Sequence, residues 1–212
     1  MGIEKGDMTL KGRDAIKKSK EIFVESYTSF PYELDFETTL LPRDEVESNF
    51  LLDKAKEDII AILIPGDPLF ATTHISLIKE GKEKGIEIEV IHAPSIINAI
   101  ARTGLSTYKF GRIVTLSQTY ESDKERIENN LKASLHSLCL IDPEMKLDEA
   151  IRILRTMGFD NEILICERLG SKTEKIHFGK EFTLDFGKPP YSIIIPGELH
   201  FFEEEFIQQF RV

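Results

Sequence analysis

Apolar and polar positions along the chain follow two different periods. Short runs rich in β-branched and aromatic residues, such as EIFVESY at 21–27 and IIAILI at 59–64, have the length and composition of strands. Longer segments at 9–19 and 44–56 place their apolar residues on one side of a helix. Thr9 stands where a helix N-cap belongs. Since IIAILI is continuously apolar, we predict that it forms a central parallel strand buried on both faces.

The same alternation continues to the end of the chain. We predict helices at 72–84, 95–102, 122–134, 147–157 and after His200, and strands at 86–91, 112–116, 137–142, 162–167, 174–178 and 191–195. Strands that alternate with helices form α/β units. The polar segment SQTYESDKE at 117–125 is the best linker candidate. We therefore expect two α/β domains, residues 1–117 and residues 118–212.

Composition narrows the class of protein. The chain has 212 residues, 41% of them hydrophobic, and a formal net charge of -10. This charge opposes nucleic-acid binding, because phosphate contacts need an excess of Lys and Arg. No apolar stretch approaches the roughly 20 residues that span a bilayer, and the opening MGIEKGDMTLKG has no hydrophobic signal region. Cys139 and Cys166 lie in apolar runs typical of buried thiols. We expect a cytoplasmic protein that binds neither nucleic acid nor membrane.

The ends of the predicted strands carry the candidate chemistry, since ligands of open α/β sheets collect at the carboxyl ends of strands. The strongest case is PGDPLFATTH, directly after the apolar run at 59–64. Gly66 permits a turn there, and the carboxylate of Asp67 can accept hydrogen bonds from ligand hydroxyls or an ammonium. A purely turn-forming role for Asp67 is the competing interpretation. Ser95 in HAPSI offers a hydroxyl at a helix start, which is equally consistent with a plain N-cap.

Several familiar sites are missing from the sequence. It contains no P-loop and no G-x-S-x-G motif. The histidines lack metal-ligand spacing, two cysteines cannot build a Cys₄ site, and no metal site is predicted. Each histidine is interpreted as a structural residue; the five are His74, His92, His136, His177 and His200. Any chemistry is therefore expected to come with a bound cofactor.

Several motifs, in order along the chain, resemble those of one protein family. PGDPLFATTH, IHAPSI, TGLSTYKFG, HSLCLID and FGKPPYSIIIPGELH are similar to segments of the diphthine synthase family, in the tetrapyrrole-methylase-like class of S-adenosylmethionine-dependent methyltransferases. TLKGRDAIKKSKEIFVESYTS and RDEVESNF extend the likeness over nearly the whole chain. GDPL alone is shared across the wider class, whereas GDPL-x-ATTH combined with TGL-x-x-Y-x-FG is far more specific.

The resemblance implies both a fold and an activity. The fold would be two α/β domains of the tetrapyrrole-methylase type with the cofactor cleft between them, in a chain that forms a homodimer. The activity would be methyl transfer from S-adenosyl-L-methionine to the amino group of the modified histidine of translation elongation factor 2, in diphthamide biosynthesis. The alternatives are a related tetrapyrrole or RNA methylase, or a catalytically silent truncated relative.

Motif by motif, the resemblance implies eight cofactor contacts and no catalytic residue. The contacts are Gly2, Asp67, Phe70, Ser95, Ile96, Ile141, Leu169 and Tyr191. On the residues alone, ordinary core packing is an equally good interpretation of Ile96, Ile141 and Leu169.

The sequence departs from the family pattern in places that bear on these contacts. Leu169 stands where the family tends to have a small residue, and Tyr191 replaces its usual histidine, so we expect a narrower pocket or an altered hydrogen bond. The segment after Leu116 is shorter than the family's and lacks an aromatic and proline-rich loop. Family members begin with a strand that leads into a glycine-rich loop. The sequence given begins inside that loop, so the first strand is expected to be missing.

Overall fold

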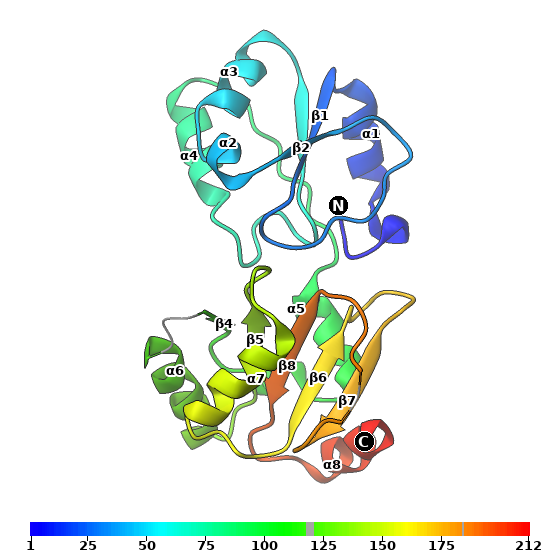
Figure 1. The fold of residues 1–212 in the computed structure, drawn as a ribbon. Helices are drawn as coiled ribbons and strands as arrows, with labels where there is room; N and C mark the ends of the chain where they lie inside the picture. The colour runs from blue at the N-terminus through cyan, green and yellow to red at the C-terminus, as the bar shows by residue number, and fades with distance from the viewer. Residues whose placement is uncertain (118–120, 184) are drawn as a thin grey trace. The chain divides into compact units, whose positions relative to one another are not determined.

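The computed structural model describes residues 1–117, 121–183 and 185–212. Contacts divide the chain into two compact units, Met1–Ile96 and Ile97–Val212, each with its own sheet (Figure 1). The sequence places the domain boundary at residues 117–118 instead. Residues 118–120 of the predicted linker lie outside the described residues, so that boundary stays a prediction.

The first unit is built on a parallel sheet of three strands in the order β2-β1-β3. β1 (Glu21–Glu25) is central, between β2 (Thr39–Leu41) and β3 (Ile60–Leu63). The prediction that 59–64 is a central strand buried on both faces is therefore wrong in its placement. The strand forms, but it lies at an edge of the described sheet, and three of its four residues are only half-buried. The burial of a strand depends on which strands lie beside it, and the apolar content of a segment does not specify those neighbours.

Four helices belong to this unit, and two of the predictions near them need comment. They are α1 (Leu10–Lys18), α2 (Arg43–Val46), α3 (Phe50–Glu57) and α4 (Ile75–Glu83), and α5 (Ile96–Ala99) begins at the last residue of the unit and continues into the second. The predicted cap of α1 is confirmed, since Thr9 Oγ1 accepts the N–H of Gly12 at 3.0 Å. The single helix predicted at 44–56 is broken into α2 and α3, because the Ser48 hydroxyl bonds to Glu45 O and to Phe50 N and competes with the helical backbone pattern.

The strand predicted at 86–91 is not formed. The segment pairs with none of the described strands. Ile88 packs instead against α4, where a Cβ added to Gly81 would lie 2.3 Å from Ile88 Cδ1. An alternation of apolar residues creates a face to bury, but a strand also needs a hydrogen-bonding neighbour. The helix predicted at 95–102 is likewise short, because α5 passes into a 3₁₀ turn, η2 (Ile100–Thr103).

The second unit contains a five-stranded mixed sheet in the order β4-β5-β8-β6-β7 (Figure 1). β4 and β5 are parallel, and the other neighbours are antiparallel. All five strands agree with the sequence predictions: β4 (Val114–Leu116), β5 (Ser137–Ile141), β6 (Ile163–Glu167), β7 (Lys175–Gly179) and β8 (Tyr191–Ile195). Their presence confirms that short β-branched runs bounded by polar turns are reliable here.

Helices α6 (Glu121–Lys132) and α7 (Leu147–Thr156) supply apolar side chains to the core of this sheet. Ile127 and Leu154 join the cluster that also contains strand residues, and both predicted buried thiols, Cys139 and Cys166, are fully buried. Burial raises the pKa of both thiols, that of Cys166 to about 12. Neither is a reactive thiolate. In the described part of the chain, no helix combines the length and apolar character that crossing a membrane requires.

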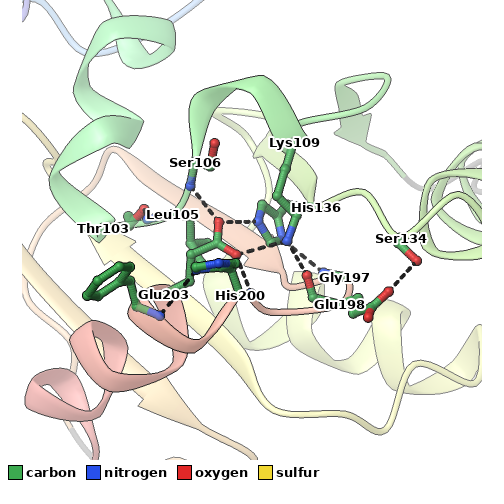
Figure 2. A network of polar contacts seen from close by, with 11 residues as sticks. Thr103, Leu105, Ser106, Lys109, Ser134, His136, Gly197, Glu198, His200 and Glu203 are labelled. Carbon is green, nitrogen blue, oxygen red and sulfur yellow. Dashed lines mark hydrogen bonds and ion pairs between the residues drawn. The ribbon is translucent and has the colours of Figure 1, made fainter.

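The closing helix α8 (Phe201–Ile207) is held in place by Glu203, which is 4% exposed (Figure 2). Four groups donate hydrogen bonds to its carboxylate: Ser106 N (2.7 Å), His200 N (2.8 Å), Lys109 Nζ (2.9 Å) and His136 Nε2 (3.1 Å). Burial alone would raise the pKa of Glu203, but these donors outweigh it and lower the pKa to about 2. The carboxylate is therefore ionised at ordinary pH, with Lys109 as its counter-charge.

His136 is completely buried beside this carboxylate, and both of its ring nitrogens are used (Figure 2). Its Nδ1 accepts the N–H of Gly197 at 3.0 Å. The ring proton therefore lies on Nε2, which faces Glu203. Burial lowers the pKa of His136 even though Glu203 opposes the shift, so the ring is neutral. With both nitrogens bonded, His136 is a structural residue of the second unit.

Candidate functional site

Five of the eight predicted contacts belong to the first unit. Three segments of this unit, at Gly2, Gly66 and Ser95, meet where β3 ends. Gly2 exchanges two backbone hydrogen bonds with Gly66, at 3.1 and 2.9 Å. Gly66 has a φ of 73°, and a Cβ there would lie 3.3 Å from Ser95 Cβ. The close approach and the left-handed backbone together explain why glycine stands at 66. The structure thus brings Gly2, the turn at Gly66 and Ser95 into one place.

Asp67 lies directly after this turn, with its side chain 15% exposed. Its Oδ1 accepts the N–H of Leu69 at 3.0 Å, and its Oδ2 accepts from Ala93 N at 3.3 Å and from His92 Nδ1 at 2.8 Å. Burial alone would raise the pKa of Asp67, but these three donors outweigh it and lower the pKa. The turn-forming interpretation is therefore right in part, because Asp67 closes the turn while it also fixes His92.

Phe70, Ser95 and Ile96 complete the first-unit group. Phe70 and Ile96 are half-buried, and Ser95 is 4% exposed immediately before α5. Ala71, next to Phe70, has a φ of 57°. A left-handed non-glycine residue costs about 1–3 kcal/mol and tends to occur at functional sites. The strained backbone beside Phe70 is consistent with a segment shaped for binding.

The other three contacts, Ile141, Leu169 and Tyr191, belong to the second unit, and the topology of its sheet gathers them at one edge. Ile141 ends β5 and Tyr191 begins β8, which runs antiparallel to β5. Tyr191 also pairs with Glu167, the last residue of β6. Leu169 follows two residues later and is 5% exposed. The three predicted contacts therefore lie at the same end of the β5-β8-β6 strands.

Glu167 holds the loops at that edge together. It is 1% exposed, and its two carboxylate oxygens bond to His177 Nε2 at 2.7 Å and to Gly187 N at 2.8 Å. Burial alone would raise the pKa of Glu167, but these donors and the neighbouring Arg168 lower it. Arg168 has a φ of 45°, so a left-handed residue again stands next to a predicted contact. The Tyr191 hydroxyl donates to Gly187 O, so the phenol is bonded within its own loop.

Two residues of the candidate site, His92 and Glu167, have partners that the sequence does not reveal. On the sequence, His92 is interpreted as structural, and Glu167 has no role beyond its place at a strand end. The signal for His92 is its position, directly after an extended segment and two residues before the Pro94 that precedes Ser95. Nothing in the sequence alone says that Asp67, 25 residues earlier, is its partner. In the described part of the chain, no group of three or more His, Cys, Asp or Glu side chains could hold a metal ion.

Comparison with known proteins assigns this architecture to a family. The model described as Tetrapyrrole (Corrin/Porphyrin) Methylases matches residues 2–185. The chain belongs to the tetrapyrrole methylase family. The predicted α/β fold with two sheets is confirmed, and so is the prediction that this tetrapyrrole methylase is a methyltransferase.

Similar proteins fall within one branch of the tetrapyrrole methylases. Diphthine synthase of Methanocaldococcus jannaschii is 37% identical over 238 residues, which cover 95% of this chain and 93% of that protein. Diphthine methyl ester synthase of Dictyostelium discoideum is 32% identical over 262 residues and covers 100% and 96%. A crystal structure of diphthine synthase aligns with a TM-score of 0.90 at 28% identity, over 99% of this chain and 94% of that one. The predicted resemblance to the diphthine synthase family is therefore confirmed.

Proposed function

We propose that this tetrapyrrole methylase transfers methyl groups from S-adenosyl-L-methionine to the amino group of the modified histidine of translation elongation factor 2. The step belongs to diphthamide biosynthesis. The observation that carries the proposal is the 37% identity to the Methanocaldococcus jannaschii diphthine synthase over 95% of this chain. The side chains at the strand ends support it independently, because they include an ionised carboxylate, a hydroxyl and several apolar groups.

The first-unit group fits this cofactor chemically. S-adenosylmethionine has an ammonium group and ribose hydroxyls that need acceptors, apolar surfaces that need apolar contacts, and a sulfonium that supplies an electrophilic methyl group when bound. Asp67 is the ionised acceptor, and Ser95 contributes a hydroxyl. Phe70 and Ile96 are half-buried apolar side chains. A Cβ at Gly2 would lie 2.3 Å from Asp7 Cβ, and one at Gly66 would lie 3.3 Å from Ser95 Cβ, so the two glycines let these segments pack closely against the turn.

The chain's own contribution to catalysis is position. Methyl transfer to an amine is an in-line displacement, for which a well-aligned site can reach effective molarities of about 10⁵–10⁸ M. Alignment needs rigid supports, and both groups have them. Asp67 accepts three hydrogen bonds across its turn, and Glu167 ties the loop of Leu169 to that of Tyr191. We propose that all eight predicted contacts bind the cofactor, five of them from the first unit and three from the second.

The proposed macromolecular partner is elongation factor 2 as a protein substrate. We further propose that the chain forms a homodimer and acts in the cytoplasm. Equilibrium sedimentation tests the dimer. A mass near twice the 24.2 kDa of one chain supports it, and a mass of one chain at micromolar concentration contradicts it.

Isothermal titration with S-adenosylmethionine tests the cofactor. We expect heat of binding for the wild-type chain, a roughly tenfold weaker affinity for Asp67→Asn, and no change for Asp53→Asn. Asp53 is the matched control, because it is an exposed carboxylate of the same unit paired only with Lys56 among the described residues. Absence of binding by the folded wild-type chain contradicts the proposal.

A labelled-methyl assay tests the substrate. Elongation factor 2 whose modified histidine carries an unmethylated amino group should take up label from S-adenosylmethionine. Label on RNA or on a tetrapyrrole, with none on the factor, favours the alternative methylases and contradicts the proposal.

The name of the Dictyostelium discoideum relative gives a specific reason to consider a second reaction, since that protein is a diphthine methyl ester synthase. An ester would form on a carboxylate instead of an amine. Mild base removes a methyl ester and leaves an N-methyl group in place. Mass spectrometry of the modified factor before and after base treatment therefore separates the two: loss of mass indicates the ester, and constant mass indicates N-methylation alone.

A further inference from the structure

Asp67, in the turn after β3, pairs with a histidine from a segment 25 residues later, and cofactor binding does not explain this pair. His92 Nδ1 lies 2.8 Å from Asp67 Oδ2. The His92 side chain is 71% exposed, whereas the Asp67 side chain is 15% exposed. A buried acceptor thus holds an exposed imidazole by one nitrogen. Within the described residues the other nitrogen, Nε2, makes no hydrogen bond, although His92 lies only three positions before the predicted contact Ser95.

The protonation of this pair follows from its surroundings. Two backbone N–H groups, those of Leu69 and Ala93, donate to Asp67, and the pKa of its carboxyl group is low. An ionised carboxylate can only accept a hydrogen bond, so His92 Nδ1 is the donor. In a neutral imidazole the lone pair then lies on Nε2. The amino group of Met1 is a further titratable neighbour of Asp67; burial lowers its pKa to about 6, although Asp67 and Asp7 oppose the shift.

Two further histidines pair with carboxylates, and their burial separates them from His92. His136 is fully buried, and Gly197 and Glu203 occupy its two nitrogens. The His177 side chain is 15% exposed, and its Nε2 bonds to the buried Glu167. Among the histidine–carboxylate pairs of the described residues, only the one at Asp67 combines a fixed ring with a nitrogen that a large protein substrate could reach.

We propose that His92 is the proton acceptor for the substrate amine, and that Asp67 positions it. The inference rests on the proposed function. His92 Nε2 takes a proton from the substrate ammonium. The amine then uses its freed lone pair to form the new C–N bond to the methyl carbon, as the bond from that carbon to sulfur breaks and its electron pair stays on sulfur. His92 returns the proton to solvent before the next transfer.

Replacement of His92 tests this role in the full-length protein, with elongation factor 2 that carries the modified histidine and its unmethylated amino group as substrate. General base catalysis contributes typically 10²–10⁴-fold. We expect His92→Ala to lower kcat by about 10²-fold or more, with the affinity for S-adenosylmethionine by titration calorimetry within twofold of wild type. Added imidazole should restore part of the rate, which a structural role would not allow. His200→Ala is the matched control, since His200 is an exposed histidine of the second unit, and its rate should not change.

Each other outcome overturns the proposal in a distinguishable way. A kcat of His92→Ala within threefold of wild type means that another group accepts the proton. A tenfold or larger loss of cofactor affinity makes His92 a binding contact. Circular dichroism checks the fold, and His92→Gln repeats the experiment if the alanine variant is unfolded. Failure of the wild-type chain to methylate the factor rejects the proposed function itself, whereas the His92 outcomes leave it standing.

Discussion

The Asp67–His92 pair of the first unit and the Glu203–His136 pair of the second join the same two kinds of side chain at similar distances, 2.8 and 3.1 Å. In both, the carboxylate is shielded from solvent and receives backbone N–H groups that lower its pKa. The difference is the histidine. His92 is 71% exposed, and His136 is wholly buried with Gly197 on its second nitrogen. The second nitrogen therefore decides whether such a pair can exchange protons or only hold elements together.

The comparison assigns separate tasks to the two pairs. The buried pair fastens α8 to Ser106 and to His136, directly before β5 (Figure 2), so its loss should appear as lost stability. The exposed pair stands at a strand end among predicted cofactor contacts, so its loss should appear in methyl transfer. Substitutions of Glu203, Asp67 and His92 test this contrast.

The largest effect is expected for Glu203→Ala. The substitution removes the acceptor of His136 Nε2 and the counter-charge of Lys109, and breaking a buried pair by removing one partner costs about 3–5 kcal/mol. Urea denaturation measures the free energy of unfolding. Glu204→Ala is the control, because Glu204 is exposed on the same helix and should change stability by less than about 0.5 kcal/mol. A loss below about 1 kcal/mol for Glu203→Ala would remove the structural task from the buried pair.

The next largest effect is expected in the free energy of unfolding at acid pH. The folded-state pKa of Glu203 is lowered from 4.5 to about 2, so its carboxylate stabilises the fold above pH 4.5. As pH falls from 4.5 to 2, roughly 3 kcal/mol of that stability should be lost. Unfolding free energies at several pH values should show a steeper fall for the wild-type chain than for Glu203→Gln. Parallel curves for the two proteins would contradict the assignment.

A smaller loss is expected for Asp67→Asn. The amide keeps an oxygen for the Leu69 N–H but loses the charge that Ala93 N–H and His92 share, at a cost of about 1–2 kcal/mol. Cofactor affinity should fall as well, and calorimetry at a temperature where the variant is folded measures it separately. Unchanged affinity would restrict Asp67 to the turn and to the positioning of His92.

The smallest change in stability is expected for His92→Ala. An exposed side chain with one hydrogen bond should contribute within about 0.5 kcal/mol, measured by urea denaturation. Combined with a large loss of methyl transfer, this result would complete the contrast with Glu203→Ala. A loss of several kcal/mol would show that both pairs serve the fold.

How much the sequence can predict differs between the units for a physical reason. In the second unit all five strands are predictable, because each is a short β-branched run that finds partners in the described sheet. In the first unit, β3 lies at an edge and 86–91 forms no strand, since apolar periodicity specifies a face and says nothing about neighbours. β2 escapes prediction altogether, because TLL at 39–41 is too short to show a period.

The residues of the candidate site show the same limit, because the sequence does not reveal distant partners. Motifs place Asp67 and Ser95 near each other at a strand end, and the structure brings their segments together. The partnership of Asp67 with His92, and of Glu203 with His136, depends on contacts 25 and 67 residues apart in the chain, which no local pattern encodes. The eight cofactor contacts that the resemblance implies stay predictions.

The nitrogen-15 spectrum of the histidine side chains at neutral pH tests the central contrast most directly, because it reports which ring nitrogen carries the proton in both pairs at once. We expect neutral His136 to carry the proton on Nε2, with Nδ1 accepting from Gly197, and neutral His92 to carry it on Nδ1, facing Asp67. A proton on Nε2 of His92 would break its bond to Asp67, occupy the nitrogen proposed to accept the substrate's proton, and contradict the account.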